Sequence, residues 1–407
     1  MRVDAGLGDW QAITIKFSGD VIPRDRTAAF KGAMFAAYPG DLVFSKIDAR
    51  NGAVGLIPGD ITKAVVTSEY PVFVPKADKL RAAYLNYLLR ADHFKADLQR
   101  KASGTSGRKR VTPEGFLRLV VPVPSLAEQD ALVATYAEAL TRAENLTHEA
   151  DVLERAGWQA FEAALGLTPL PPAPDRPVFL ARFRDVERWS PESILRALNQ
   201  PTSTAAVWPM VPLGQVGKVT YGLQKSPANR PATHGRPYLR VSNVQRGMLD
   251  LREIKHINVP DEEMPKLRLE VGDLLLCEGN SPDLVGRGAI WRGEIADCVH
   301  QNHVLRARLD QSKLLPEFVL AVINSSYGQA YFRSKAKRTT NLASINSKEV
   351  ASLPVPLPSV SDQRALLKEL DRGVAAAQRK QSEATALRQS AWSTFEAALF
   401  TPSEAAA

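Results

Sequence analysis

The stretch WQAFEAAL at residues 158–165 recurs as WSTFEAAL at residues 392–399, 234 positions further along the chain. Six of these eight residues are identical. A second pair keeps the same offset, because PVPSLAEQ at 122–129 matches PLPSVSDQ at 356–363. Two pairs with one constant offset indicate a tandem duplication. The fold is therefore expected to consist of two similar halves.

Each copy ends in a long segment with a heptad pattern. Small and aliphatic residues alternate at steps of four and three from Leu132 to Ala164, and a similar pattern runs from Leu367 to Ala398. This spacing is typical of a coiled-coil seam. Since a seam rich in alanine buries little surface, each helix needs a partner, and the helix of the other copy is the obvious one. We expect an antiparallel coiled coil; packing of each helix on its own half, or on another chain, is the alternative.

An α+β pattern precedes each long helix. A repeated Gly-Asp-Leu at 40–42 and 272–274 marks equivalent turns in the two copies, here with an offset of 232. Turn residues delimit the expected β segments, which are 40–58 and 64–75 in copy one and 237–247, 272–280, 286–293 and 298–309 in copy two. One helix is expected after each sheet region, at 84–99 and at 316–336.

These patterns predict five parts of the chain. They are a first α+β domain (1–125), a first coiled-coil helix (126–167), a proline-rich linker (168–177), a second α+β domain (178–359) and a second coiled-coil helix (360–402). Copy two has a segment, 180–237, before the point at which copy one begins, so the first domain is expected to be short at its N-terminus. A start further upstream and a genuinely reduced domain explain this equally well.

Positive charge is concentrated in two loops at equivalent positions of the copies. The formal net charge is +8, and the loops are ASGTSGRKRVTPEGF (102–116) and KRTTNLASINSKEV (337–350). Short hydroxyl side chains beside Arg and Lys suit phosphate contact, and Asn341 and Asn346 add amides that suit base edges. An ordinary solvated loop is the alternative, but the recurrence favours nucleic-acid contact. The candidate residues here are Ser103, Thr105, Arg108, Lys109, Arg110, Lys335, Lys337, Arg338, Thr339, Thr340 and Asn341.

Three further polar segments are candidates for DNA contact. The loops 45–51 and 278–287 follow the Gly-Asp turn and an apolar strand in both copies, and the segment 221–243 is rich in Gly, Pro and cations. Structural turn roles are the alternative for these segments. The candidate residues are Lys46, Arg50, Asn51, Lys225, Arg236, Arg240, Asn243, Asn280 and Arg287.

The sequence contains no recognisable catalytic or metal-binding motif. Gly214 and Gly217 are too close for a phosphate-binding loop. Cys298, His300 and His303, with Cys277 as a fourth ligand, do not have the spacing of a standard zinc site, so no metal is expected. The first residues lack the pattern of a signal peptide, and charged residues interrupt every apolar run. We therefore expect a cytoplasmic protein without a membrane partner.

On these features the chain resembles the specificity subunits of type I restriction-modification enzymes over nearly its whole length. The resemblance is carried by the Gly-Asp-Leu turns, the Pro-x-Pro-Ser-x-x-x-Gln turns (122–129, 356–363) and the Phe-Glu-Ala-Ala-Leu helix ends (161–165, 395–399). It implies two target-recognition domains, each reading one half of a bipartite site in double-stranded DNA. It also implies that the helices fix the gap between the half-sites and dock two methyltransferase subunits, with restriction (translocase) subunits as further partners.

The same resemblance implies a non-catalytic chain without a cofactor of its own. S-adenosylmethionine, ATP and Mg would belong to the partner subunits, which carry out methylation and cleavage. Two other functions remain open at this point. The chain would be a coiled-coil scaffold if it lacks sequence-specific DNA binding. A stand-alone nuclease would need a cluster of carboxylates or histidines, and none is visible in the sequence.

Overall fold

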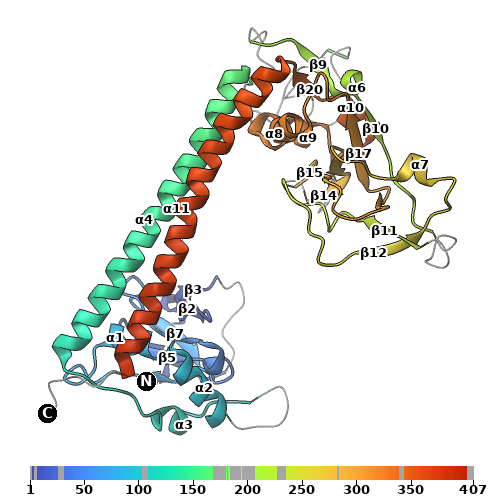
Figure 1. The fold of residues 1–407 in the computed structure, drawn as a ribbon. Helices are drawn as coiled ribbons and strands as arrows, with labels where there is room; N and C mark the ends of the chain where they lie inside the picture. The colour runs from blue at the N-terminus through green and yellow to red at the C-terminus, as the bar shows by residue number, and fades with distance from the viewer. Residues whose placement is uncertain are drawn as a thin grey trace. The chain divides into compact units, whose positions relative to one another are not determined.

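The computed structural model describes residues 2–3, 7–25, 32–102, 109–167, 180, 182–183, 194, 207–226, 235–281, 284–338 and 343–400. Contacts divide the chain into two compact units, one formed by residues up to 149 together with those from 380 onward, and one formed by residues 150–379. Each unit contains one α+β domain and a stretch of both long helices (Figure 1). The predicted linker at 168–177 lies outside the described residues.

Domain one, which precedes the first long helix, contains two sheets. A five-stranded sheet has the order β1-β4-β7-β2-β3, and a three-stranded sheet has the order β6-β5-β8. Its elements are β1 (Arg2–Val3), η1 (Leu7–Asp9), β2 (Gln11–Ile15), β3 (Val21–Pro23), β4 (Met34–Ala37), β5 (Leu42–Phe44), η2 (Ala49–Asn51), β6 (Val54–Leu56), β7 (Ala64–Thr67), β8 (Val72–Phe73), α1 (Ala82–Leu88), α2 (Asp92–Lys101) and α3 (Pro113–Leu117). The smaller sheet packs through Phe44, whose ring stacks on Phe116 at a centroid distance of 4.3 Å.

Domain two contains a four-stranded sheet of the order β10-β17-β13-β15 and a three-stranded sheet of the order β12-β11-β16, with shorter pairings beside them. Its strands are β9 (Met210–Pro212), β10 (Gly217–Thr220), β11 (Gly235–Leu239), β12 (Lys255–Asn258), β13 (Leu274–Cys277), β14 (Gly279–Asn280), β15 (Gly288–Ile290), β16 (Val299–His300), β17 (Val304–Leu309), β18 (Lys337–Arg338), β19 (Ala343–Ser344) and β20 (Pro354–Pro356). Its helices are α6 (Leu213–Val216), α7 (Met264–Leu267), α8 (Pro316–Asn324), α9 (Ser326–Lys335) and α10 (Ser347–Ala351).

The duplication seen in the sequence is also present in the order and pairing of the helices and strands. When the offset of 234 residues is applied, α2 and α3 coincide with α9 and α10, and the start of α1 coincides with the start of α8. In the sheets, β13 pairs with β15 and β17 as β5 pairs with β6 and β8, antiparallel in every case. Domain two additionally has β10 on β17 and β9 on β20. In the described part of domain one, no strand occupies the places of β9 and β10.

The expectation of one helix after each sheet region is wrong, because each helix is broken into two. In domain two the break lies at Ser325, whose backbone is extended (φ −62°, ψ 164°) and whose hydroxyl accepts a hydrogen bond from the Gly328 N–H at 3.3 Å. In domain one it lies at Ala91, which is also extended (φ −61°, ψ 142°). A serine at this place caps the second helix of the pair and ends the first. The break recurs at equivalent positions of the two copies, so it belongs to the repeated unit.

Each long helix has a defined beginning. Helix α4 spans Leu126–Leu165 and α11 spans Val360–Phe400. Ser125 and Glu128 form reciprocal hydrogen bonds at the start of α4, with Ser125 N–H donating to the Glu128 carboxylate at 2.8 Å. At α11 the Asp362 N–H donates to the Ser359 hydroxyl at 3.2 Å. Such caps satisfy amide groups that have no partner within the helix.

Helix α4 also has a defined end. Gly166 has a φ of +65°, a left-handed conformation that favours glycine, and the Leu167 N–H turns back to donate to the Glu162 carbonyl at 2.9 Å. The last turn of the helix is thereby closed. The observed bounds of α4 and α11 therefore lie within two residues of the predicted ones.

Helices α4 and α11 pack together as an antiparallel pair in both units (Figure 1). In the first unit the Tyr136 ring lies edge-on to Trp392, and Lys380 forms an ion pair with Glu149 at 2.9 Å. In the second unit a Cβ placed on Gly373 would lie 3.3 Å from the Gly157 Cα, so the two backbones approach closely. The predicted alanine seam is buried at its centre, at Ala143, Ala150, Ala377 and Ala384. Leu153 and Gln381, which the heptad pattern also placed in the seam, are exposed.

None of the helices in the described ranges combines the length and the apolar character that crossing a bilayer requires.

Candidate nucleic-acid interface

A glutamine fastens the start of α4 to domain one. Gln129 is fully buried, and its side-chain amide donates to the carbonyls of Lys79 (2.9 Å) and Pro124 (2.8 Å). Its carbonyl accepts from the Arg81 N–H at 2.8 Å. These bonds explain why the repeated motif ends in Gln, since one primary amide satisfies three backbone groups from two segments.

The same contact recurs at the start of α11. Gln363 is fully buried, donates to the carbonyls of Lys313 (2.8 Å) and Pro358 (3.0 Å), and accepts from the Leu315 N–H at 2.9 Å. Every partner is the repeat equivalent of its counterpart in domain one. The repeated glutamine is therefore a structural residue that docks each long helix on the domain preceding it.

The glutamates of the repeated helix ends dock on the opposite domains. Near the end of α4, Glu162 accepts hydrogen bonds from the Ser326 N–H (2.5 Å) and hydroxyl (2.9 Å), at the start of α9. Near the end of α11, Glu396 accepts from the Asp92 N–H at 2.9 Å, at the start of α2. A carboxylate at a helix N-terminus satisfies a free amide and interacts favourably with the helix dipole. Each long helix is thus attached to domain one at one of its ends and to domain two at the other.

In domain two the structure brings three of the predicted DNA-contact segments together. Strand β14 pairs with β19 so that Gly279 faces Ser344, and β18 pairs with β19 so that Lys337 faces Ser344. The Tyr221 hydroxyl accepts from the Ser347 N–H at 3.1 Å, which brings the segment 221–226 to the start of α10. We call five polar residues of these neighbouring segments surface two, and they are Lys225, Glu278, His303, Lys337 and Ser344.

Surface two contains a hydrogen bond between a histidine and a carboxylate. His303 Nδ1 lies 2.6 Å from the Glu278 carboxylate, and the two side chains are 55% and 24% exposed. The backbone holds both residues, because the Glu278 N–H donates to the His303 carbonyl at 3.0 Å. The carbonyl of Glu278 in turn accepts from the Ile345 N–H at 2.8 Å.

Domain one has the same backbone arrangement with other side chains. The Lys46 N–H donates to the Glu69 carbonyl at 3.0 Å, and the Val111 N–H donates to the Lys46 carbonyl at 2.8 Å. The Arg110 side chain, which is 45% exposed, donates through Nε to the Glu69 carboxylate at 3.0 Å. We call Lys46, Glu69, Lys109 and Arg110 surface one. By backbone position, Lys46, Glu69 and Arg110 correspond to Glu278, His303 and Ser344 of surface two.

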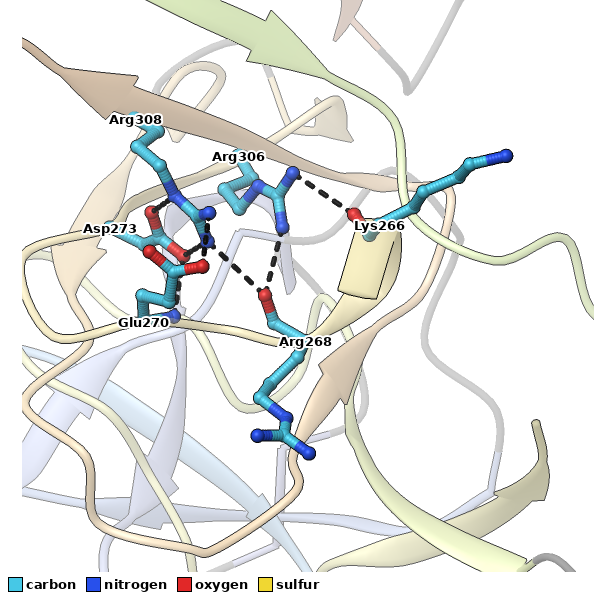
Figure 2. Close-up of polar contacts among 6 residues, drawn as sticks. All are labelled: Lys266, Arg268, Glu270, Asp273, Arg306 and Arg308. Atoms are coloured by element: carbon cyan, nitrogen blue, oxygen red, sulfur yellow. Dashed lines mark hydrogen bonds and ion pairs between the residues drawn. The ribbon is translucent and has the colours of Figure 1, made fainter. Parts of the chain in front are cut away.

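A polar cluster fixes the other end of the strand that leads to Glu278 (Figure 2). Asp273, directly before β13, is 1% exposed and receives both Nε and Nη2 of Arg308, at 2.7 and 2.8 Å. Its carboxylate also accepts from the Glu270 N–H at 2.7 Å. Beside it on β17, Arg306 donates to the carbonyls of Arg268 (3.0 Å) and Lys266 (3.2 Å). The cluster links β13, β17 and the loop before β13 through side-chain hydrogen bonds.

One predicted DNA contact is wrong, because the side chain serves the fold. Asn243 is 3% exposed; its amide donates to the carbonyls of Asp250 and Glu253, and its carbonyl accepts from the Arg240 N–H. It closes a turn and is not available to a base. Asn346 caps α10, where its side-chain carbonyl oxygen accepts from the N–H groups of Lys348 and Glu349, and base contact by its amide group stays a prediction.

The other residues predicted to contact DNA have different surroundings in the structure. Arg236 forms ion pairs with Asp261 and Asp297, Arg240 with Glu253, and Arg287 donates to the Val241 carbonyl. These local partners give each arginine a structural role, and DNA contact by them stays a prediction. DNA contact by Arg50 on η2, by Asn51 and by Lys335 also stays a prediction. The residues Ser103, Thr105, Arg108, Thr339, Thr340 and Asn341 lie outside the described residues, as do the side chains of Asn280 and Arg338.

Four residues of the two surfaces were missed at the level of sequence: Glu69, Glu278, His303 and Ser344. Glu69 and His303 lie in strand connections without a charge cluster, and Glu278 is an acid in a segment where cations were sought. The repeat offset would have found two of them, because Glu69 and His303 occupy equivalent positions of the two copies. Their significance lies in pairing across the chain, which local sequence does not show.

Three of the four residues considered for a zinc site, Cys277, Cys298 and His300, behave as core residues, whereas His303 is exposed. Cys277 and Cys298 are free and buried, and burial raises the pKa of the Cys298 thiol to about 12. His300 is 1% exposed, and its Nδ1 donates to the Val304 carbonyl at 2.7 Å. Within the described ranges, no group of three His, Cys, Asp or Glu residues is arranged to hold a metal ion.

The buried His300 makes domain two sensitive to acid. Burial lowers the pKa of His300 to about 4, from 6.5. Between these values the unfolded chain binds a proton that the folded chain does not, so stability is complete above pH 6.5 and falls as the pH falls towards 4. We expect domain two to lose about 2 kcal/mol between pH 7.5 and pH 5 through this residue.

Pulsed hydrogen exchange of the β16 and β17 peptides in urea, at both pH values, measures this loss. The variant His300→Gln should flatten the pH dependence, whereas His256→Gln, at an exposed histidine of the same domain, should leave it unchanged. An unaltered pH dependence in His300→Gln would show that another group is responsible.

Comparison with known proteins adds relatives in sequence and in fold. The chain is 28% identical over 137 residues to a Methanocaldococcus jannaschii protein named as the MjaX type I restriction enzyme specificity subunit, and 22% identical over 268 residues to the EcoKI specificity subunit of Escherichia coli. These matches cover 33% and 64% of this chain. The chain is related to the specificity subunits of type I restriction enzymes. The matches span only 32% and 52% of the relatives' own lengths.

The fold has a counterpart among solved structures. A chain from a study of complex assembly and conformational transition of a type I restriction-modification system superposes with a TM-score of 0.62 at 18% identity, over 96% of this chain and 91% of the other. No known family profile matches the sequence. The predicted fold class, two α+β domains each followed by a long helix with the helices paired, is confirmed.

Proposed function

We propose that this chain is the non-catalytic DNA-specificity subunit of a type I restriction-modification complex. Each domain reads one half of a bipartite site in double-stranded DNA, using surface one and surface two. The observation that carries the proposal is the matched pair of surfaces: the same backbone junction occurs in both domains, directly beside a loop rich in Lys, Arg, Ser and Thr, with different side chains at equivalent positions.

The composition of the two surfaces supports contact with nucleic acid. Lys109 and Lys337 are exposed members of the two basic loops. Lys225 is also exposed, and Leu223, two residues before it, pairs with Gln301, two residues before His303. Exposed cations that are not neutralised by the fold supply the salt-dependent, non-specific part of DNA affinity. Polar side chains held by backbone hydrogen bonds supply the specific part.

The long helices supply the partner surface in this proposal. They dock two methyltransferase subunits, and restriction subunits join the complex through these. Catalysis, with S-adenosylmethionine, ATP and Mg, then belongs to the partners. In support, Val152 and Leu153 in the middle of α4 are 45% and 37% exposed. A partner helix that packs on this stretch of α4 would cover both side chains.

Replacing the cations of both surfaces should abolish most DNA binding. In a variant with Lys46, Lys109, Arg110, Lys225 and Lys337 changed to Ala, we expect affinity for duplex DNA to fall at least about thirtyfold at 0.15 M salt. The plot of log K against log salt should also become shallower, by about 0.9 for each phosphate that is no longer bound. Fluorescence anisotropy with a labelled duplex, over a salt series, measures both quantities.

A matched variant separates local contact from net charge. Changing Lys76, Lys255, Lys266, Lys368 and Arg372 to Ala removes the same charge from exposed positions outside both surfaces, and it should leave affinity within about threefold. Equal loss in both variants would contradict the assignment of the surfaces. An absence of DNA binding in the wild-type chain, alone and with a methyltransferase partner, would favour the scaffold alternative.

The complete proposal is tested with the partner enzyme. Together with its methyltransferase, the chain should direct methylation to one bipartite sequence. Methylation that is unchanged when the chain is omitted would contradict the proposed function.

A further inference from the structure

Resting on the proposed function, we propose that surface one reads a guanine through Arg110 and that surface two reads a cytosine through Glu278. These residues belong to backbone junctions that are equivalent in the two domains but carry opposite charge. The two half-sites therefore differ in the base that each junction prefers.

In surface one, a carboxylate orients the arginine for base contact. Arg110 Nε donates to Glu69, and within the described residues this is the only side-chain hydrogen bond of Arg110. A single bond at Nε restricts the guanidinium plane and leaves the two terminal nitrogens as donors on a side chain that is 45% exposed. Such a pair of donors matches the O6 and N7 acceptors of guanine in the major groove. Glu69 is a positioning residue in this arrangement.

In surface two, the histidine orients a carboxylate. His303 Nδ1 donates to one oxygen of Glu278 at 2.6 Å, which leaves the other oxygen as an acceptor. The Glu278 backbone is fixed on both sides, by the bonds to His303 and Ile345. A carboxylate oxygen in this position accepts from the exocyclic amino group of cytosine. Arg110 of surface one is replaced here by Ser344, so the guanine-reading group is absent from this junction.

The Glu278 carboxylate in surface two weakens DNA binding unless it contacts a base. Surface two is proposed to face phosphates, and phosphates repel a carboxylate. A cation at this position, as at Lys46 in domain one, would strengthen non-specific binding. The acid is explained when it accepts a hydrogen bond from a base edge, since this contact selects one base and penalises the others.

Selection from a randomised duplex library with the full chain, followed by sequencing, tests the assignment. Arg110→Ala should lower the preference for guanine at one position of one half-site about tenfold, and Glu278→Ala should lower the preference for cytosine at one position of the other half-site about tenfold. All other positions should keep their preferences. Neither change removes the backbone hydrogen bonds that form the junctions.

Neighbouring lysines serve as matched controls. Lys109→Ala and Lys337→Ala should weaken binding evenly across sequences without altering any base preference, as phosphate contacts do. The proposal is overturned if Arg110→Ala and Glu278→Ala behave like these controls or leave the selected sequences unchanged, while the wild-type chain still selects a bipartite site. If the wild-type chain selects no sequence at all, the proposed function itself fails and this inference with it.

Discussion

Replacing Gln363 by Ala should loosen the start of α11 on domain two and lower the free energy of unfolding of that domain by about 4 kcal/mol. The substitution leaves the Leu315 N–H and the carbonyls of Lys313 and Pro358 without their partner, in a place where the glutamine itself is fully buried. Buried groups without a hydrogen bond are costly, and alanine offers these three groups no polar atom in exchange.

The duplicated chain contains its own control for this prediction. Gln129→Ala makes the same change in domain one, where the partners are Lys79, Arg81 and Pro124. Pulsed hydrogen exchange in urea should show reduced protection in domain two for Gln363→Ala and in domain one for Gln129→Ala. The exposed neighbour Arg364, changed to Ala, should alter neither domain. Equal effects on both domains from one substitution would show that the glutamine does not act locally.

The features that sequence predicts well in this chain are those that local patterns and the repeat determine. The long helices begin and end within two residues of expectation, because a heptad pattern and Ser-based caps define a helix without reference to the rest of the fold. The repeat also aligned the strands that follow the Gly-Asp turns of the two domains, β5 and β13.

The features that sequence does not predict depend on pairing between distant segments. Strands β2 and β11 hold similar places, since β2 runs parallel to β7 as β11 runs parallel to β16, but their sequences do not match. The breaks at Ala91 and Ser325 are stabilised by glutamates from the far ends of the long helices, Glu396 and Glu162. Of the candidate interface, the basic loops were found from charge alone, whereas the pairing of Glu69 with Arg110 spans 41 residues of sequence.

Replacing Asp273 by Ala should lower the free energy of unfolding of domain two by about 3 kcal/mol. The aspartate is 1% exposed and holds Arg308 through two parallel hydrogen bonds (Figure 2). Its removal leaves Arg308 with Glu270 as its one carboxylate partner in the described part of the chain. The loss is smaller than for a completely buried pair, because Arg308 is 34% exposed and water reaches it.

Domain one again provides a matched control. Asp41 holds the equivalent turn by accepting from the Tyr38 N–H at 2.8 Å, and the residue in the place of Arg308 there is Val74. Asp41→Ala should therefore lower the stability of domain one by only about 1 kcal/mol, the value of one hydrogen bond. Urea midpoints from pulsed hydrogen exchange of β13 and β5 compare the two variants directly.

A double substitution distinguishes the loss of the ion pair from the loss of the turn. If most of the effect of Asp273→Ala comes from leaving Arg308 unpaired, then Asp273→Ala combined with Arg308→Leu should be less destabilised than the sum of the single variants, by about 1 to 2 kcal/mol. Strict additivity would mean that the aspartate acts only through the Glu270 N–H. Because β13 leads directly to Glu278, Asp273→Ala should also weaken the base preference of surface two. Asp41→Ala should leave that preference unchanged.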